Sequence, residues 1–371
     1  MIMISRGMTM ISVNDKVPPL MVFFLISASQ IGVGFLGFQS IINQYAGHDA
    51  WISVIVAGLG VSAIIWIMYQ ILKHDDKGDI IAVHQFTYGK WLGNFLTLLF
   101  IMYLLLMATV VLRTYIEIIQ VWMFPHLKVW AFLLLLIPLI YYTISDQFRT
   151  VVGVCFLGIV YPFFLNLSLL YPLTYAEFTY IMPIMDHAIT DIMQSSTLAV
   201  LNFMGFSALF VFYPFIRESG KSQKYAHYGN LYTTVLYVLV CLIAYVFYSQ
   251  RELDEVIWPT LELWKILEMP LMERFEYFGI ATMFFTILPN VVLFMWAATR
   301  TVNRAFGFQH KKVAVVLLII LYIASVISTG REGVNILNDS AGRIGLVFLF
   351  IYIPVLFIIH FIRRKVRKNV S

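Results

Sequence analysis

The sequence predicts an all-α integral membrane protein with ten transmembrane helices, organised as a five-plus-five inverted repeat in which helices 1 and 6 are discontinuous. The first observation is the composition, because 61% of the 371 residues are hydrophobic and only 12% are charged, whereas a soluble domain carries about 25% charged residues. The second is the mean hydropathy of +0.84. The third is the recurrence of apolar runs near the roughly 20 residues that cross a bilayer. We therefore expect residues 1–371 to form a single membrane domain.

The apolar runs divide the chain into ten expected helices. The third and eighth are long enough to cross the bilayer at a tilt, and the fourth is short. Residues 20–172 would form the first five-helix repeat and residues 196–362 the second, followed by a basic cytoplasmic tail at 363–371. The expected spans are 20–44, 50–72, 92–122, 128–144, 149–172, 196–216, 229–250, 271–299, 313–330 and 343–362.

Lysine and arginine indicate the orientation, because the cytoplasmic connections of membrane proteins carry an excess of both. If the N-terminus lies inside, most of the 25 lysines and arginines fall in cytoplasmic connections. An even number of helices then places both termini in the cytoplasm. On this topology the segment DIIAVHQFTYG (79–89) is an interfacial helix on the cytoplasmic side. The long connections at 173–195 and 251–270 face outward.

Several classes of function find no support in the sequence. It contains no phosphate-binding loop, no HExxH motif and no paired-cysteine metal site, and its eight histidines are scattered. We therefore expect neither an enzyme nor a bound cofactor or metal. The basic residues are explained by orientation in a membrane, so membrane lipid is an expected partner and nucleic acid is not.

Glycines mark helices 1 and 6 as discontinuous. Helix 1 contains SQIGVGFLGFQS with Gly32, Val33 and Gly34, and helix 6 contains NFMGFSALFVFYP with Gly205 at a similar depth. The words FLGF and FMGF stand at the first helix of each expected repeat. Unwound backbone survives in a membrane only where it is buried or lines a cavity. Broken helices can bind a carboxylate or a cation, although glycines also serve close helix packing.

Helices 3 and 8 carry the other polar candidates. Arg113 and Glu117 lie four residues apart on helix 3, where they can pair with each other. Charges in lipid are costly, so both should face the bundle interior, as a structural ion pair or as a lining of the ligand site. Thr282, Thr286 and Asn290 form a polar stripe on helix 8. Their side chains either line the site or bond to nearby backbone and neighbouring helices.

The stretch VIWPTLELWKILEMPLMERFEYFGIA (256–281) places Glu273, Arg274 and Glu276 at the start of helix 8. Carboxylates near a helix N-terminus are stabilised by the helix dipole. We therefore expect the two acids to cap the helix and Arg274 to reach a lipid headgroup or a neighbouring carboxylate. This reading leaves the preceding word WPTLELWK unexplained.

The chain resembles a known family nearly from end to end, the B subunits of bacterial spore germinant receptors, also called endospore germination permeases. The similarity is carried by ISASQIGVGFLGF, AGHDAWIS, YGKWLG, FVFYPFI and WPTLELWKILEMPLMERFEYF, in this order. The last of these is the most specific, because it combines an external loop with an acid–arginine–acid word. The family lies within the amino acid–polyamine–organocation transporter superfamily, so the resemblance also implies the inverted repeat.

The resemblance further implies a function and a site. Such a subunit would lie in the inner membrane of a spore, bind a small nutrient such as an amino acid, and act with an A-type subunit and a lipoprotein C-type subunit. Gly32 and Gly34 match the family's first broken helix, and Met204, Gly205 and Phe206 match the sixth. Arg113, Glu117, Thr282 and Thr286 are the further ligand-binding candidates. Ser207 replaces a carboxylate found in several relatives, which argues against simple proton coupling there.

Three functions are compatible with these residues. The first is a nutrient sensor that signals germination through partner subunits. The alternative is a proton- or sodium-coupled amino acid permease, which would use the same pocket, and a weaker third is an ion or water conduit in a larger complex. As a sensor, the chain could offer Trp258, Trp264 and Lys265 of the external connection to a partner subunit.

Overall fold

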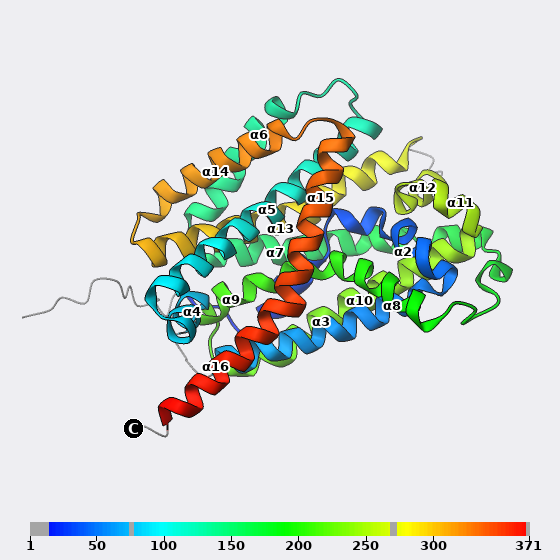
Figure 1. Ribbon diagram of the computed structural model, residues 1–371. Helices are drawn as coiled ribbons and strands as arrows, with labels where there is room; N and C mark the ends of the chain where they lie inside the picture. Colours follow the sequence, from blue (N-terminus) through cyan, green and yellow to red (C-terminus); the bar gives the residue numbers. More distant parts are fainter. Residues whose placement is uncertain (1–14, 74–77, 268–272, 369–371) are drawn as a thin grey trace, which may run out of the picture.

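The computed structural model describes residues 15–73, 78–267 and 273–368, which form a bundle of helices running alongside one another (Figure 1). Within these residues eight helical segments are long and apolar enough to cross a membrane, and no strand is present beyond one isolated bridge between Val17 and Ile216. Together with the composition, this makes the chain a multi-pass integral membrane protein.

The helical segments follow the expected order. Two shorter apolar helices, α1 (Met21–Gln30) and α6 (Val129–Ser145), accompany the eight long segments. The remaining helices are α2 (Phe38–Ala46), α3 (Ala50–Leu72), α4 (Ile80–Tyr88), α5 (Lys90–Trp122), α7 (Phe148–Ser168), α8 (Ile189–Val200), α9 (Leu209–Phe212), α10 (Gln223–Phe247), α11 (Gln250–Glu255), α12 (Pro259–Lys265), α13 (Phe275–Phe306), α14 (His310–Ile327), α15 (Gly330–Val347) and α16 (Ile353–Lys368).

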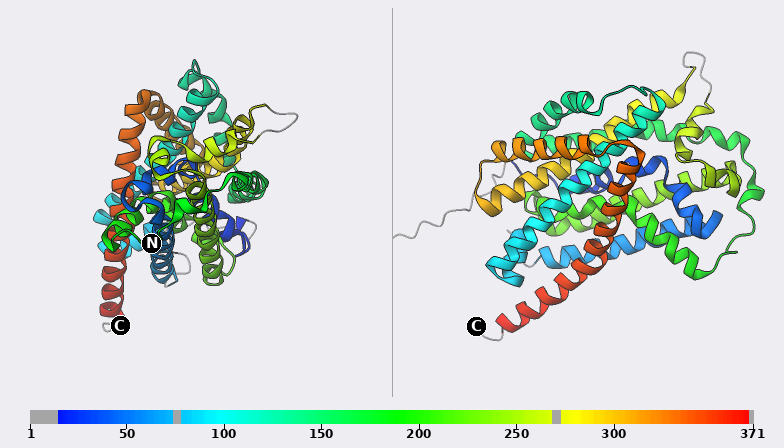
Figure 2. Two further views of the ribbon diagram at one scale, coloured as in Figure 1. Left: turned by 90° about the vertical axis from the view of Figure 1, so that its right-hand side faces the viewer. Right: turned by 45° about the horizontal axis from the view of Figure 1, so that its top comes forward.

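Two ends of the bundle are distinguished below as the α4 end and the α12 end, which lie on opposite sides in Figure 1 and in the right-hand view of Figure 2. The short helix α4 confirms the helix expected within residues 79–89, and the Asp79 side chain caps it by accepting a hydrogen bond from the Ala82 N–H. Helix α11 begins with a capping box between Ser249 and Glu252, and α12 begins at Pro259.

The first segment is interrupted between α1 and α2. Gly32 is extended, with φ −133° and ψ −155°, and a 3₁₀ turn over Val33–Leu36 follows. Gly37 then precedes α2. The chain therefore leaves helical geometry just after Gln30 and regains α-helical geometry at Phe38. We call residues 31–37 the break.

The sixth segment was expected to be discontinuous, but its helical structure has no gap. It remains helical from α8 to α9, but Leu201–Ala208 adopts 3₁₀ geometry. A Cβ atom added to Gly205 would lie 1.7 Å from the Ser29 carbonyl oxygen. Only glycine lets the two backbones approach this closely. The segment is 83% buried over its apolar window, so it lies in the middle of the bundle.

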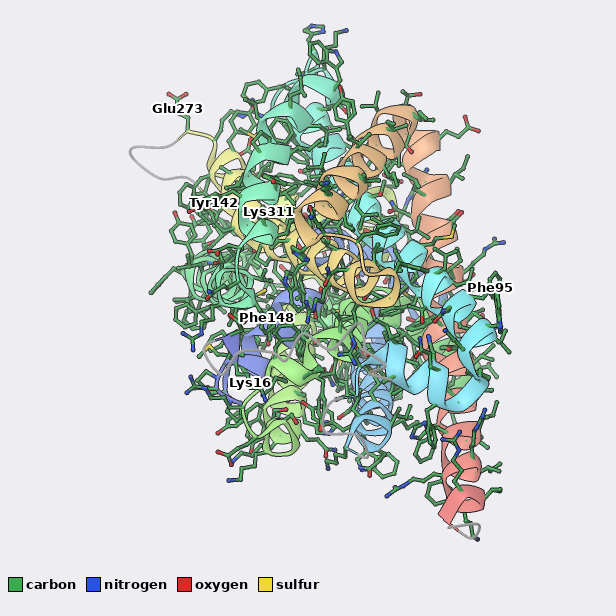
Figure 3. All side chains as sticks on the ribbon, turned by 90° about the vertical axis from the view of Figure 1, so that its left-hand side faces the viewer. Lys16, Phe95, Tyr142, Phe148, Glu273 and Lys311 are labelled. Carbon is green, nitrogen blue, oxygen red and sulfur yellow. The ribbon has the colours of Figure 1, made fainter. Side chains whose placement is uncertain are left out.

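The surrounding helices enclose these two segments. Helix α1 packs against α7 and α10, and α13 packs against α5 and α7. Large apolar side chains face outward instead, as Phe95 of α5 does at the edge of the bundle (Figure 3). Phe95 is 55% exposed and Tyr142 of α6 is 71% exposed. Exposed apolar rings of this kind are suited to contact with lipid.

The last helix differs most from its expected bounds. Residues 331–342, expected as an outer connection, belong to α15, and residues 363–368 of the expected tail continue α16 (Figures 1 and 2). The apolar pattern that predicts a transmembrane helix is weak here because α15 is polar. Its Asn335 and Asn338 line a cavity instead of facing lipid. Residues 369–371 of the expected tail lie outside the described residues.

Replacing Gly205 by alanine should destabilise the protein. The new methyl group would overlap the Ser29 backbone, and overpacking of a buried contact costs about 1–3 kcal/mol or more. The thermal midpoint of the detergent-purified variant should fall. Gly153→Ala on α7 is the matched control, because nothing lies within 4 Å of an added Cβ there. Equal midpoints for the two variants would contradict this packing.

Candidate functional site

A cavity of about 460 Å³ lies beside the break. It is lined by the break, the 3₁₀ part of the sixth segment, and parts of α5, α13 and α15. Polar and apolar side chains are mixed in the lining. The volume is within the usual range for small-molecule sites.

The break forms one wall of the cavity through Gly32, Val33 and Gly34. A Cβ atom added to Gly34 would lie 2.0 Å from the Asn202 side-chain oxygen, so glycine allows the sixth segment to approach. At Gly32 the nearest side-chain atom to an added Cβ would be Asn290 Oδ1, at 3.7 Å. This is an ordinary contact distance, so a methyl group can be accommodated there.

Three side chains satisfy the backbone at or beside the break. Asn290 of α13 donates from Nδ2 to the carbonyl oxygens of Ala28 (2.7 Å) and Ile31 (2.8 Å). The Tyr237 hydroxyl of α10 lies 2.9 Å from the Gln30 carbonyl oxygen and 3.3 Å from that of Asn202, so its single hydrogen is shared between these two acceptors. Tyr237 thus joins the first and sixth segments.

The third side chain comes from α12. Thr260 donates from Oγ1 to the Phe35 carbonyl oxygen at 3.0 Å and accepts a hydrogen bond from Gln39 Nε2 at 2.7 Å. A Cβ atom added to Gly37 would lie 2.6 Å from the Ile257 carbonyl oxygen. The connection that carries WPTLELWK is therefore packed into the break and covers the cavity at the α12 end.

This packing explains the tryptophans of that connection. Trp264 is fully buried, and a Cβ atom on Gly279 would lie 2.5 Å from its ring. Trp258 lines the cavity. The expectation that Trp264 presents a surface to a partner subunit is therefore wrong for this structure, whereas the Lys265 side chain is exposed. Two apolar rings at this membrane end are used for internal packing.

An ion pair lies elsewhere in the lining. Arg331 of α15 donates from Nη1 to Glu117 Oε1 at 3.3 Å, and its guanidinium lies 5.1 Å from the centroid of the Trp258 ring. Thr114 donates to Asn338 Oδ1 at 3.2 Å. Helices α5 and α15 are thus joined across the cavity by charged and polar groups.

Arg113 does not form the expected pair with Glu117. Among the ion pairs of the described residues, Glu117 pairs with Arg331, and Arg113 instead donates from Nε to the Ser328 carbonyl oxygen at 2.7 Å. Arg113 is nearly fully buried and does not line the cavity. The neighbouring helix α15 offers Glu117 a partner that spacing along α5 could not reveal.

The acids at the start of α13 also differ from expectation. The N-cap position is held by Arg274 without a capping side-chain hydrogen bond. Arg274 donates from Nε to Glu276 Oε1 at 2.8 Å, and Glu276 is buried. The expected contact of Arg274 with a neighbouring carboxylate is confirmed. Within the described residues, no side chain accepts the helix's first N–H groups as a cap.

At the α4 end, contacts between distant segments close this end of the bundle. The Val17 N–H donates to the Phe215 carbonyl oxygen at 2.9 Å, and the Arg217 N–H donates to the Val17 carbonyl oxygen at 2.8 Å. Arg304 pairs with the buried Asp79 at 2.9 Å. The two backbone hydrogen bonds tie the segment before α1 to the end of the sixth segment, and the ion pair ties α13 to the start of α4.

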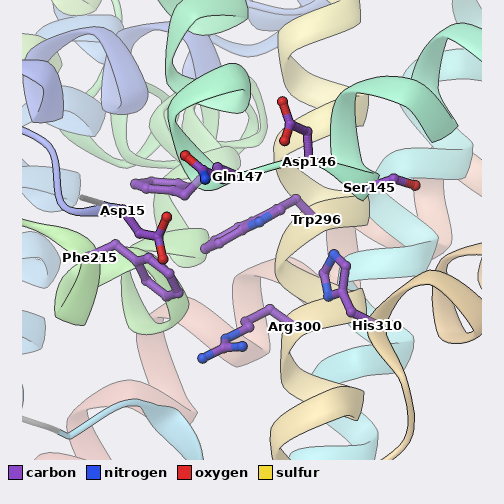
Figure 4. Close-up of a pocket in the computed structure, with 9 residues that line it drawn as sticks. Asp15, Ser145, Asp146, Gln147, Phe215, Trp296, Arg300 and His310 are labelled. Atoms are coloured by element: carbon purple, nitrogen blue, oxygen red, sulfur yellow. The ribbon is translucent and has the colours of Figure 1, made fainter. Parts of the chain in front are cut away.

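A second cavity of about 270 Å³ lies beside this closure. Asp15, Phe215 and Trp296 line it, together with Arg300 and His310 (Figure 4). The Phe215 and Trp296 rings pack with centroids 5.1 Å apart, and Arg300 lies 5.3 Å from the Phe215 centroid. No residue of the break lines this second cavity. The cavity of about 460 Å³ beside the break is therefore the candidate ligand site.

Comparison with known sequences identifies the family. The sequence model of a family described as spore germination protein matches residues 16–334. The spore germination protein GerQB of Bacillus cereus is 40% identical over 361 residues, which cover 97% of this chain and 100% of the relative. The chain belongs to the spore germination protein family. Spore germination protein YndE of Bacillus subtilis is 22% identical and covers 94% of this chain and 97% of its own length.

Solved structures that share this fold include a symporter and a protein in complex with an amino acid. A Na⁺-coupled sialic acid symporter in a substrate-bound outward-open state matches with a TM-score of 0.65 and 13% identity, over 91% of this chain and 80% of its own. MhsT in complex with L-phenylalanine matches with a TM-score of 0.62 and 14% identity, over 92% of this chain and 87% of its own. At these identities the likeness shows the fold alone. Membership of this family indicates a non-enzymatic membrane protein.

The germination protein places only part of the predicted site at the cavity. Gly32, Val33, Gly34, Glu117, Met204 and Gly205 line it. Arg113, Phe206, Thr282 and Thr286 do not. Phe206 and Thr282 are buried in packing, and Thr286 borders a separate void of about 10 Å³.

Sequence analysis missed several residues of the cavity. Tyr237 and Arg331 line it from elements that carry no motif of their own, whereas Gln30 and Asn202 stand within SQIGVGFLGFQS and NFMGFSALFVFYP but were not singled out beside the glycines. Asn290 was recognisable only as the third member of the stripe with Thr282 and Thr286. The direction of each side chain toward the break depends on how the helices pack, which no local pattern contains.

Removing the Tyr237 hydroxyl should loosen the junction between the first and sixth segments. Tyr237→Phe leaves the carbonyl oxygens of Gln30 and Asn202 without this donor, and a buried polar group without a partner costs about 1–3 kcal/mol. The thermal midpoint should fall relative to Tyr142→Phe, which changes an exposed ring. An unchanged midpoint in both variants would show that this hydrogen bond contributes little.

Proposed function

We propose that this chain is the membrane subunit of a nutrient germinant receptor, in which the larger cavity binds a small nutrient, most simply an amino acid. The observation that carries the proposal is a mixed polar and apolar cavity at a helix break, in a chain that belongs to the spore germination protein family. Binding would shift an equilibrium between two conformations, and A-type and lipoprotein C-type subunits would receive the change.

The lining supports a small ligand without net charge. Glu117 and Arg331 neutralise each other, and Asp254 accepts a hydrogen bond from Asn43 at 2.7 Å. An anionic ligand would meet no free positive charge among these groups, and burying such a charge is costly. The Asp254 carboxylate is bonded only to a neutral amide among these contacts, so it can balance the ammonium group of an amino acid. Met107, Val111 and Phe294 supply apolar surface. A neutral or zwitterionic amino acid with an apolar side chain fits this combination.

The same proposal covers the topology. Counting α1 with α2 as one discontinuous helix, and adding α6 to the long segments, gives ten transmembrane helices, with 20–172 and 196–362 as inverted repeats. At the α4 end, Arg217 and Lys221 lie between α9 and α10, and Lys90 and Lys311 lie in the first turns of α5 and α14. This supports a cytoplasmic α4 end with both termini inside. The compartment would be the spore inner membrane.

A ligand can shift the conformational equilibrium only if it binds the two states differently. The elements that line the cavity also satisfy the break, as Asn290, Tyr237 and the α12 connection show. A ligand that contacts Gly32 and Gly34 would therefore act on contacts that hold α10, α12 and α13 together. Ligand binding in the cavity could in this way change the conformation of helices at the surface of the receptor.

The alternative is a proton- or sodium-coupled amino acid permease with the same binding cavity. Purified protein in liposomes, a panel of radiolabelled amino acids, and imposed proton or sodium gradients distinguish the two. A sensor should show saturable binding without accumulation. Gradient-driven accumulation would instead establish a permease. Absence of saturable binding to every amino acid would contradict the proposed ligand class.

Gly32→Ala should weaken ligand binding while the protein remains folded. The methyl group enters the wall of the cavity but meets Asn290 only at ordinary contact distance. We expect the dissociation constant of the amino acid identified in the panel to rise about tenfold, equivalent to about 1.4 kcal/mol. Gly153→Ala is again the control, and the thermal midpoints should agree. Loss of Gly32→Ala from the membrane would show that Gly32 serves packing.

A further inference from the structure

The end of α1 presents backbone oxygens of the kind that bind cations in broken membrane helices. Helix α1 ends at Gln30, so the carbonyl groups of its last turn lack the N–H partners that a continuing helix would supply. Unwound carbonyls at such ends coordinate sodium in transporters. The sialic acid symporter that shares this fold is Na⁺-coupled. A sodium ion at the break would need the same carbonyl oxygens to be free of other partners.

A side-chain amide already occupies these oxygens. Asn290 Nδ2 lies 2.7 Å from the Ala28 carbonyl oxygen, 2.8 Å from that of Ile31 and 3.2 Å from that of Thr286. The first two belong to the end of α1 and the third to α13. A cation that touched these oxygens would have to lie where the amide nitrogen lies. The amide N–H₂ is a donor and supplies no ligand atom to a metal.

The amide is held in place by its surroundings. Asn290 is 2% exposed, and its Oδ1 faces Gly32, where an added Cβ would lie 3.7 Å away. The two acids that line the cavity, Glu117 and Asp254, are engaged with Arg331 and Asn43. Within the described residues, no carboxylate bonds to the groups around Asn290. The three carbonyl oxygens are ligands of the kind that sodium uses, but the Asn290 N–H₂ group occupies the position between them, so this arrangement does not fit a sodium ion.

We propose that the Asn290 amide takes the place of a coupling cation at the break, so that this chain holds its interrupted helix without sodium. The partial positive charge of the N–H₂ group neutralises the helix-end carbonyls, as an ion would. This role goes beyond nutrient sensing, since it applies equally to a sensor and to a permease. It also removes sodium binding at this position as a source of coupling.

The proposal predicts that one atom exchange creates a cation site. Asn290→Asp replaces the donor nitrogen by a carboxylate oxygen next to the carbonyl oxygens of Ala28 and Ile31. The Thr286 hydroxyl is buried one helical turn away, without a hydrogen-bond partner among the described residues, and offers another oxygen. Oxygen atoms with one negative charge are the ligands preferred by hard cations.

The test uses the purified full-length chain and ²²Na⁺, with no nutrient. The wild type should show no saturable ²²Na⁺ binding and the same thermal midpoint in sodium chloride and choline chloride. Asn290→Asp should bind about one ion per chain and have a higher midpoint in sodium chloride than in choline chloride. Asn303→Asp adds the same charge near the C-terminal end of α13 and should behave as the wild type does.

Three results would overturn the proposal: saturable ²²Na⁺ binding to the wild type, no sodium response in folded Asn290→Asp, or an equal response in Asn303→Asp. If Asn290→Asp is recovered only in sodium, the proposal is supported. If Asn290→Asp is recovered in neither salt, ²²Na⁺ binding to the wild type decides: no saturable binding supports the proposal, and saturable binding overturns it. Because no nutrient is present, failure here is distinct from failure of the germinant-receptor proposal.

Discussion

The carbonyl groups freed by the break in the first helical segment must find donors inside the protein, and the packing around the break follows from that constraint. An unsatisfied peptide group in hydrocarbon costs several kcal/mol. Asn290 serves Ala28 and Ile31, Tyr237 serves Gln30, and Thr260 serves Phe35. The donors come from α13, α10 and α12. Three distant elements are thereby bound to the same seven-residue stretch, residues 31–37, and its flanks.

This constraint also explains why the cavity and the break form one unit. Glycines allow the close approach of the sixth segment at Asn202 and of the α12 connection at Ile257. The remaining space is the cavity, whose wall is the break itself. A molecule bound in the cavity would therefore contact backbone whose hydrogen bonds hold the bundle together. Such an arrangement suits a receptor, because binding energy acts directly on the contacts that define the conformation.

The differences between expectation and structure have one physical origin. Charges and polar groups on membrane helices were expected to pair locally, as Arg113 with Glu117 at helical spacing. Glu117 instead meets Arg331 of α15, and Arg113 meets a carbonyl at the end of α14. The polar first half of α15 was taken for a connection because its side chains face the cavity and not lipid. Local spacing identifies which groups need partners but not which helix supplies them.

The sequence by itself determined the membrane class, the order of the helical segments, the glycines of the break and the family. These depend on the transfer of each residue into lipid and on short words of sequence, which are local properties. The tertiary structure alone decided that α12 closes over the break, that Trp264 is buried, and that Asn290 satisfies Ala28. Asn290 and Ala28 are 262 positions apart. Contacts at that separation arise only when the helices pack, because each polar group must find the donor or acceptor that packing brings within reach.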